Sequence, residues 1–195
     1  MSAIEVVAIG ASWGGLRAIE RVLERLPADF PAAVVIAQHR RVGTDGALAE
    51  LLDSHCELTV CEAEDKQALG PGVVLVAPPD YHLLVERGAV ALSVDEPVNF
   101  SRPSIDVLFA SAADNYGDGA VGVVLTGANA DGAAGLARIA AQGGTAIVQD
   151  PDGAERREMP AAALAATPSA RVLALGDIGR LLAELACTRE GAQQS

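Results

Sequence analysis

The chain has 195 residues, half of them hydrophobic, which is enough for one domain to bury a core. Lys and Arg number 14 against 26 Asp and Glu, and the net charge of −12 argues against nucleic acid or an anionic membrane as the main partner. The three cysteines show no CxxC spacing and the three histidines lie far apart, so we expect reduced thiols and no metal site. We find no leader segment and no apolar run of spanning length, and we therefore expect a cytoplasmic protein without membrane insertion.

Short apolar runs typical of buried strands alternate with helical patterns along the chain. In chain order, we expect strands at residues 4–9, 33–37, 57–61, 73–77, 120–125, 145–148 and 172–173. Helices are expected at residues 14–26, 44–52, 104–116, 132–141, 160–165 and 177–186. Apolar runs at 83–85 and 90–92 flank a Glu-Arg-Gly-Ala turn and predict a β-hairpin, which would interrupt an otherwise parallel strand order.

This alternation predicts an α/β fold with a doubly wound, mainly parallel sheet flanked by helices, of Rossmann-like type, and a small β-hairpin insertion. We expect one domain over residues 1–187, followed by a polar, aperiodic tail at 188–195 that is disordered. Residues 96–103 form the longest irregular stretch, which indicates a functional loop. A doubly wound sheet binds its ligand at the carboxyl ends of its strands, so polar residues at those ends are the first candidates for a site.

Three expected strand ends carry such residues. Ser12 follows the first strand within the turn Gly-Ala-Ser-Trp-Gly-Gly, His39 follows the second, and Asp131 lies in a Gly-rich turn before a helix. A serine hydroxyl needs a neutral imidazole to take its proton, and the imidazole needs a carboxylate to orient it. The three residues therefore predict a catalytic triad, with the backbone amide of Trp13 and amides of the 127–129 turn, which includes Ala128, as donors to the oxyanion.

Each residue also has a structural interpretation. Ser12 and Asp131 could cap the helices that follow them, and His39 taken singly is typical of a hydrogen-bonded strand-end histidine. A nucleotide-binding Rossmann domain is a second interpretation, since Gly10 and Gly15 fit a dinucleotide fingerprint. However, Ser12 occupies its middle glycine position, no acidic residue ends the second strand, and no P-loop Lys follows Gly15.

Six segments resemble, in this order and at similar separations, the catalytic domain of CheB-type protein-glutamate methylesterases. They are residues 10–15 (GASWGG), 37–39 (AQH), 77–85 (APPDYHLLV), 102–109 (RPSIDVLF), 125–135 (LTGANADGAAG) and 158–160 (EMP). The resemblance implies hydrolysis of glutamate γ-methyl esters on chemoreceptors and deamidation of receptor glutamine in some members. It also implies that Ser12, His39 and Asp131 are nucleophile, base and acid, the same three residues that the strand ends indicate. We expect no cofactor, because a side chain or a backbone amide fills every chemical role.

The chain departs from the family pattern at two positions beside the expected nucleophile and oxyanion site. Trp13 stands where the family usually has Thr, and Ala128 stands where it usually has Met. Both changes keep the backbone N–H groups but alter the substrate groove. The chain begins almost at the first strand of the catalytic domain, so we expect no receiver domain. The partners implied are methylated receptor cytoplasmic helices and a separate receiver-domain regulator or kinase, and a catalytically silent adaptor of the same fold is a further alternative.

Overall fold

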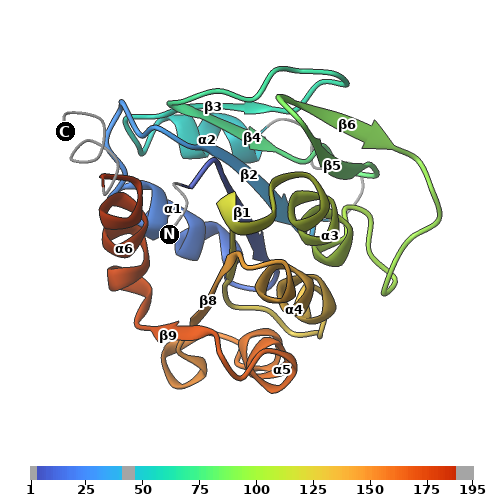
Figure 1. Cartoon of the computed structure of the whole chain (residues 1–195), viewed down its shortest axis with the longest axis vertical. Coiled ribbons are helices and arrows are strands. Elements are labelled where there is room, and N and C mark those ends of the chain that lie inside the picture. The colour runs from blue at the N-terminus through green and yellow to red at the C-terminus, as the bar shows by residue number, and fades with distance from the viewer. Residues whose placement is uncertain (1–3, 41–46, 188–195) are drawn as a thin grey trace.

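The computed structural model describes residues 4–40 and 47–187 (Figure 1). The strands of the main sheet are β1 (Val6–Ala11), β2 (Ala33–Gln38), β3 (Thr59–Glu62), β4 (Val73–Val76), β7 (Ala120–Val124), β8 (Thr145–Gln149) and β9 (Arg171–Leu173). The hairpin strands are β5 (His82–Glu86) and β6 (Ala89–Ser93). The helices are α1 (Gly15–Leu23), α2 (Ala47–Asp53), α3 (Ile105–Tyr116), α4 (Ala133–Ala141), α5 (Glu158–Ala166) and α6 (Leu175–Cys187).

The main sheet has seven strands in the order β3-β4-β2-β1-β7-β8-β9, and every neighbouring pair is parallel. The chain builds β2, β3 and β4 on one side of β1, with β4 inserted between β3 and β2, and then builds β7, β8 and β9 on the other side. The carboxyl ends of β1, β2 and β7 therefore meet at one edge of the sheet, which is the place where this architecture binds ligands.

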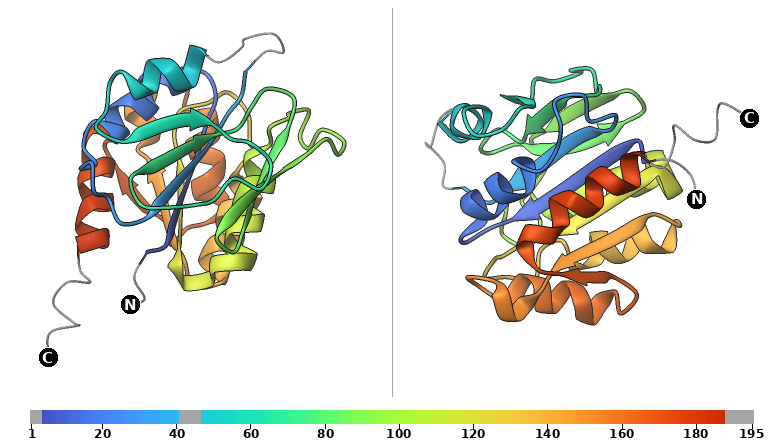
Figure 2. Two further views of the ribbon diagram at one scale, coloured as in Figure 1. Left: turned by 90° about the horizontal axis from the view of Figure 1, so that it is seen from above. Right: turned by 90° about the vertical axis from the view of Figure 1, so that its left-hand side faces the viewer.

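Helices cover both faces of the sheet, as the continuous apolar strands require (Figure 2). On one face, α1, α2 and α6 pack on strand residues such as Val7, Ile9 and Ile36. On the other face, α3, α4, α5 and the hairpin pack on residues such as Ala8 and Val35. Successive strand residues point to opposite faces, which explains why neighbours in β1 belong to different cores. The α/β fold predicted from the sequence is confirmed.

The elements also confirm most of the predicted boundaries to within a few residues, with one correction in topology. The β5–β6 hairpin forms its own two-stranded sheet, so it does not interrupt the parallel order as expected. It packs instead on α3, where Leu83, Val85 and Val90 are buried. The predicted start of the second helix at 44–46 and the predicted tail at 188–195 lie outside the described residues. Among the described helices, none has the length and apolar character needed to span a membrane.

The N-terminus of α3 lies directly against the carboxyl edge of the sheet because two glycines leave room for it. A Cβ on Gly10 would lie 2.2 Å from Ile105 Cγ2, and a Cβ on Gly132 would lie 2.6 Å from the same atom. Gly132 also has a φ of +94°, a conformation that L side chains rarely adopt. The first backbone N–H groups of α3 are thereby held close to the turn that follows β7.

Candidate active site

Ser12 is the first residue after β1, in the turn that leads to α1. Its backbone is held on both sides, because Ser12 N donates to Thr126 O at 3.0 Å and Ser12 O accepts from Gln38 Nε2 at 2.7 Å. The interpretation of Ser12 as a helix cap is wrong: the cap of α1 is Gly14, with a φ of +76° and no side-chain hydrogen bond. The Ser12 hydroxyl forms no hydrogen bond with any residue in the described part of the chain, which leaves it available for chemistry.

His39 is the first residue after β2, next to Ser12. The register pairs Ala11 with Gln38, and His39 N donates to Ala11 O at 3.1 Å, so Ser12 and His39 follow neighbouring strands at the same level. Parallel strands lie about 4.8 Å apart, so the backbones of the two residues are neighbours, although no hydrogen bond joins their side chains in the described part of the chain. The imidazole Nε2 lies 2.8 Å from Asp131 Oδ2, and the His39 side chain is only 13 % exposed.

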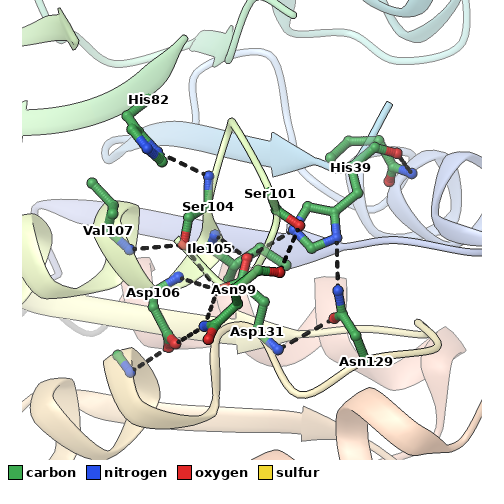
Figure 3. Close-up of polar contacts among 12 residues, drawn as sticks. His39, His82, Asn99, Ser101, Ser104, Ile105, Asp106, Val107, Asn129 and Asp131 are labelled. Carbon is green, nitrogen blue, oxygen red and sulfur yellow. Dashed lines mark hydrogen bonds and ion pairs between the residues drawn. The ribbon is translucent and has the colours of Figure 1, made fainter. Parts of the chain in front are cut away.

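Asp131 is the centre of the polar network at this edge (Figure 3). Its carboxylate is fully buried, and its two oxygens contact five donors. The donors are His39 Nε2 at 2.8 Å, Ile105 N at 2.7 Å, Ser104 Oγ at 2.9 Å, Asp106 N at 3.1 Å and Asn99 Nδ2 at 3.2 Å. The helix that follows Asp131 in the chain is not capped by it, because the cap of α4 is Gly132. Asp131 instead binds the N-terminal N–H groups of α3, where a negative charge is favoured.

These contacts decide the ionisation of Asp131. Burial by itself raises the pKa of the Asp131 carboxyl, but the hydrogen bonds from His39, from the amides of Ile105 and Asp106 and from Ser104 outweigh burial. The pKa of Asp131 therefore lies below its ordinary value of 3.8, and the group is an anion at neutral pH. Burial and the nearby charge of Asp131 raise the pKa of Asp106, which accepts from Gly135 N at 2.7 Å.

The contacts of Asn129 determine which ring nitrogen of His39 can act as a base. Asn129 Oδ1 accepts from Asp131 N at 3.2 Å, so its amide nitrogen faces His39 Nδ1 at 3.4 Å. The amide nitrogen can only donate, and Nδ1 must therefore accept. Nε2 then carries the proton that is donated to Asp131, and Nδ1 is the basic atom (Figure 3).

The turn after β7 comes very close to Ser12. A Cβ on Gly127 would lie 2.9 Å from Ser12 Cβ and 2.6 Å from Met159 Cε, so only glycine fits. Buried Thr126 fixes the turn, since its hydroxyl donates to Trp13 O at 3.0 Å and accepts from Arg156 N at 2.8 Å. The backbone amides of Trp13 and Ala128 donate to no acceptor in the described part of the chain. The predicted role of both amides in binding an oxyanion requires this.

A second serine, Ser104, contacts the same carboxylate and is itself next to His82, but this geometry supports Asp131 rather than attack on a substrate. Ser104 caps α3 and donates its hydroxyl to Asp131, not to an imidazole. His82 Nδ1 accepts from Ser104 N at 3.2 Å, and His82 Nε2 lies 3.1 Å from Glu96 O, so both ring nitrogens are occupied. Both side chains are buried.

The structure joins His39 to Asp131 and places Ser12 at the end of the neighbouring strand, and it adds Asn99 and Ser104, which the sequence did not single out. Asn99, Ser104 and Asn129 all contact the His39–Asp131 pair, and they come from different parts of the chain. Asn99 lies in the expected functional loop at 96–103 and Asn129 lies in the turn expected to supply oxyanion donors, whereas Ser104 was indicated only as part of the 102–109 segment. Among the described residues, no cluster of His, Cys, Asp and Glu could hold a metal ion.

Comparison with known proteins agrees with this geometry. Residues 7–182 match the CheB methylesterase family. A Leptospira interrogans protein named as a protein-glutamate methylesterase/protein-glutamine glutaminase is 46 % identical over 182 residues, covering 93 % of this chain and 94 % of that protein. A protein of the same activity name from Pseudomonas fluorescens is 46 % identical over 185 residues, and the chain spans 49 % of its length.

The solved catalytic domain of the Thermotoga maritima CheB methylesterase has the same fold. It superposes with a TM-score of 0.89 at 36 % identity, covering 94 % of this chain and all of that domain. The family match and these relatives favour a hydrolase over the nucleotide-binding interpretation. The chain belongs to the CheB methylesterase family of protein-glutamate methylesterases.

Proposed function

We propose that this chain hydrolyses glutamyl γ-methyl esters on chemoreceptors, releasing methanol, and that it deamidates receptor glutamine at the same site. The observation that carries the proposal is the 2.8 Å hydrogen bond between His39 Nε2 and the buried carboxylate of Asp131, formed next to the exposed turn of Ser12. Membership of the CheB methylesterase family supports the choice of ester.

The reaction begins with attack of Ser12 Oγ on the ester carbonyl. His39 Nδ1 accepts the hydroxyl proton, and Asp131 stabilises the imidazolium that forms. The 3.4 Å contact between Nδ1 and Asn129 is long, so a small rotation of the ring or of the amide lets the hydroxyl replace it. The negative charge that develops on the carbonyl oxygen is stabilised by the amides of Trp13 and Ala128.

Breakdown of the tetrahedral intermediate completes the first half of the reaction. The C–O bond to the methoxy group breaks, and the methoxy oxygen takes the proton from the imidazolium and leaves as methanol. Water then attacks the acyl-serine, with His39 again accepting a proton and returning it to the Ser12 oxygen. The products are the glutamate carboxylate and free enzyme. With glutamine as substrate, ammonia leaves in place of methanol. Every step uses a side chain or a backbone amide, so the proposal invokes no cofactor.

The substrate implied by this reaction is a methylated receptor, with its cytoplasmic helices carrying the esterified glutamate. The proposal therefore places the chain in the cytoplasm, and a receiver-domain protein or kinase is the class of regulator that we infer. The charge of −12 is consistent with a protein partner rather than a nucleic acid.

The test is methanol release from a methylated receptor fragment by the wild type and by Ser12→Ala. Ser54→Ala is a matched control, because Ser54 lies just beyond α2 and its hydroxyl donates to Leu51 O. We expect Ser12→Ala to reduce turnover by about 10⁶-fold and Ser54→Ala to have no effect. Equal background release from the wild type and Ser12→Ala would reject the enzyme and favour the adaptor interpretation.

A further inference from the structure

The six aromatic residues of the chain are divided between the core and one edge of the molecule. Three are buried: Phe30, Phe109 and Tyr116. The other three are exposed on loops at the carboxyl edge of the sheet: Trp13 (58 %), Tyr81 (40 %) and Phe100 (105 %). Phe100 is thus as accessible as it would be in an extended chain. Large exposed aromatic side chains are uncommon on surfaces that bind nothing and are enriched at interfaces.

Trp13 and Phe100 lie on opposite sides of the Ser12–His39 pair. Trp13 follows β1 and reaches toward the β8 side, where its indole Nε1 donates to Glu155 Oε1 at 3.0 Å and its ring lies under the Arg156 guanidinium at 5.3 Å. Phe100 lies on the β4 side, and it lines a cavity of about 380 Å³ together with His39. In the sheet order β4-β2-β1-β7-β8, the strand that leads to Ser12 lies between the strands that the two aromatic groups approach.

The loop that carries Phe100, residues 94–103, extends from the body of the molecule between β6 and α3 (Figure 1). Its conformation is nevertheless closely held. Val98 and Ser101 exchange two backbone hydrogen bonds of 3.1 and 2.9 Å, which close the turn around the tip. At the base, Arg102 binds Val94 O and Asp95 O as well as the carboxylate of Asp80. The exposure of Phe100 is therefore a property of a fixed loop.

The tip of this loop has an unfavourable backbone conformation that the active site maintains. Asn99 and Phe100 have φ values of +51° and +61°, and a positive φ is rare for a residue with an aromatic side chain. The Asn99 amide nitrogen donates to Asp131 at 3.2 Å and to Asp106 at 2.9 Å, which ties the strained tip to the catalytic carboxylate. Holding Phe100 in solvent near His39 therefore lowers the stability of the fold.

We propose that Phe100 and Trp13 form an aromatic docking pair for the protein substrate, binding apolar side chains that flank the esterified glutamate. The occupant is the methylated protein itself, because its ester must reach Ser12, which follows a strand that lies between those the two aromatic groups approach. This inference rests on the proposed function and adds to it the residues that select a protein over a small ester. Phe100 acts as a specificity residue, since its exposed side chain forms none of the hydrogen bonds of the catalytic groups.

The test compares two substrates: a methyl-esterified receptor fragment, followed by methanol release, and p-nitrophenyl acetate, a small ester that does not span the docking pair. Phe100→Ala is expected to raise KM for the receptor fragment about tenfold, and the ratio of kcat/KM between the two substrates should fall by the same factor. Phe100→Leu should recover most of the loss, because it restores apolar area. Val172→Ala is the matched control, since Val172 is 47 % exposed on β9, the edge strand beyond β8.

The outcomes separate this inference from the proposed function. A wild type that releases no methanol would refute both. An active wild type in which Phe100→Ala and Val172→Ala have the same KM for the receptor fragment would refute the docking pair alone. Analytical ultracentrifugation identifies another occupant: a wild-type dimer that Phe100→Ala converts to a monomer would show that Phe100 binds a second copy of the chain, and would also overturn the inference.

Discussion

Replacing Asp131 with alanine should damage both the chemistry and the fold, whereas replacing Ser12 should damage only the chemistry. Asp131 accepts hydrogen bonds from the hydroxyl of Ser104 and from the amides of Ile105 and Asp106, besides its bond to His39. Asp131→Ala leaves these donors without an acceptor in a site that is closed to solvent. The Ser12 hydroxyl, in contrast, has no hydrogen-bond partner among the described residues.

The size of the stability loss follows from the donors that are abandoned. An unsatisfied buried donor costs about 1–3 kcal/mol. Three such donors around one cavity that relaxes should lower the free energy of unfolding by about 4 kcal/mol. For a domain of this size that corresponds to a fall in Tm of about 10 °C. Turnover should also fall by about 10⁴-fold, because His39 loses the anion that orients it.

Urea unfolding followed by circular dichroism measures the first effect, and methanol release measures the second. Ser12→Ala should unfold within about 0.5 kcal/mol of the wild type although it is inactive. Asp131→Asn is the informative intermediate, since it retains one acceptor oxygen but removes the charge. If Asp131→Ala proved as stable as Ser12→Ala, Asp131 would not hold the start of α3, and the argument from its five donors would be wrong.

Three further results are expected. The difference in unfolding free energy between wild type and Asp131→Ala should be constant at neutral pH and should shrink as the pH falls below about 4. The reason is that a carboxyl with a lowered pKa gives stability that is lost when the carboxylate is protonated. Urea titrations at several pH values check this, and a difference that grows in acid would contradict it. Gly127→Ala should lower kcat about 100-fold, since its Cβ would press on Ser12 Cβ, whereas Gly176→Ala, with nothing within 4 Å, should keep full activity in the same assay. Gln38→Met should lower the free energy of unfolding in urea by about 1 kcal/mol and kcat by about tenfold, because it removes the 2.7 Å hydrogen bond to Ser12 O. If the variant keeps the kcat of the wild type, this hydrogen bond does not position the nucleophile.

Much of the fold could be predicted from the sequence because its signals are local. The apolar runs of β1, β2 and β7 are buried along their whole length, which is why they read as parallel strands without alternation. The hairpin was also predicted from its two runs and the turn between them. The position of the hairpin could not be predicted, because its packing on α3 rather than on the sheet depends on contacts between residues far apart in sequence.

The triad could be proposed from the sequence because each member follows a strand, and parallel strands of a doubly wound sheet end at a common edge. The residues that hydrogen-bond to the triad could not be proposed in the same way. Ser104 and Asn99 donate hydrogen bonds to Asp131 only because α3 lies against Gly10. No local sequence pattern predicts which helix will pack against a distant carboxylate. The tautomer of His39 likewise depends on the amide of Asn129, which is 90 positions away.

By itself, the sequence determined the order of strands and helices, the three strand-end residues and the glycines of their turns, because periodicity and turn chemistry act over a few residues. Only the tertiary structure decided that Asp131 binds the start of α3 rather than capping its own helix, and that Phe100 stands in solvent. The physical reason is that hydrogen-bond partners and exposure are set by which distant elements pack together, and packing is a property of the whole chain.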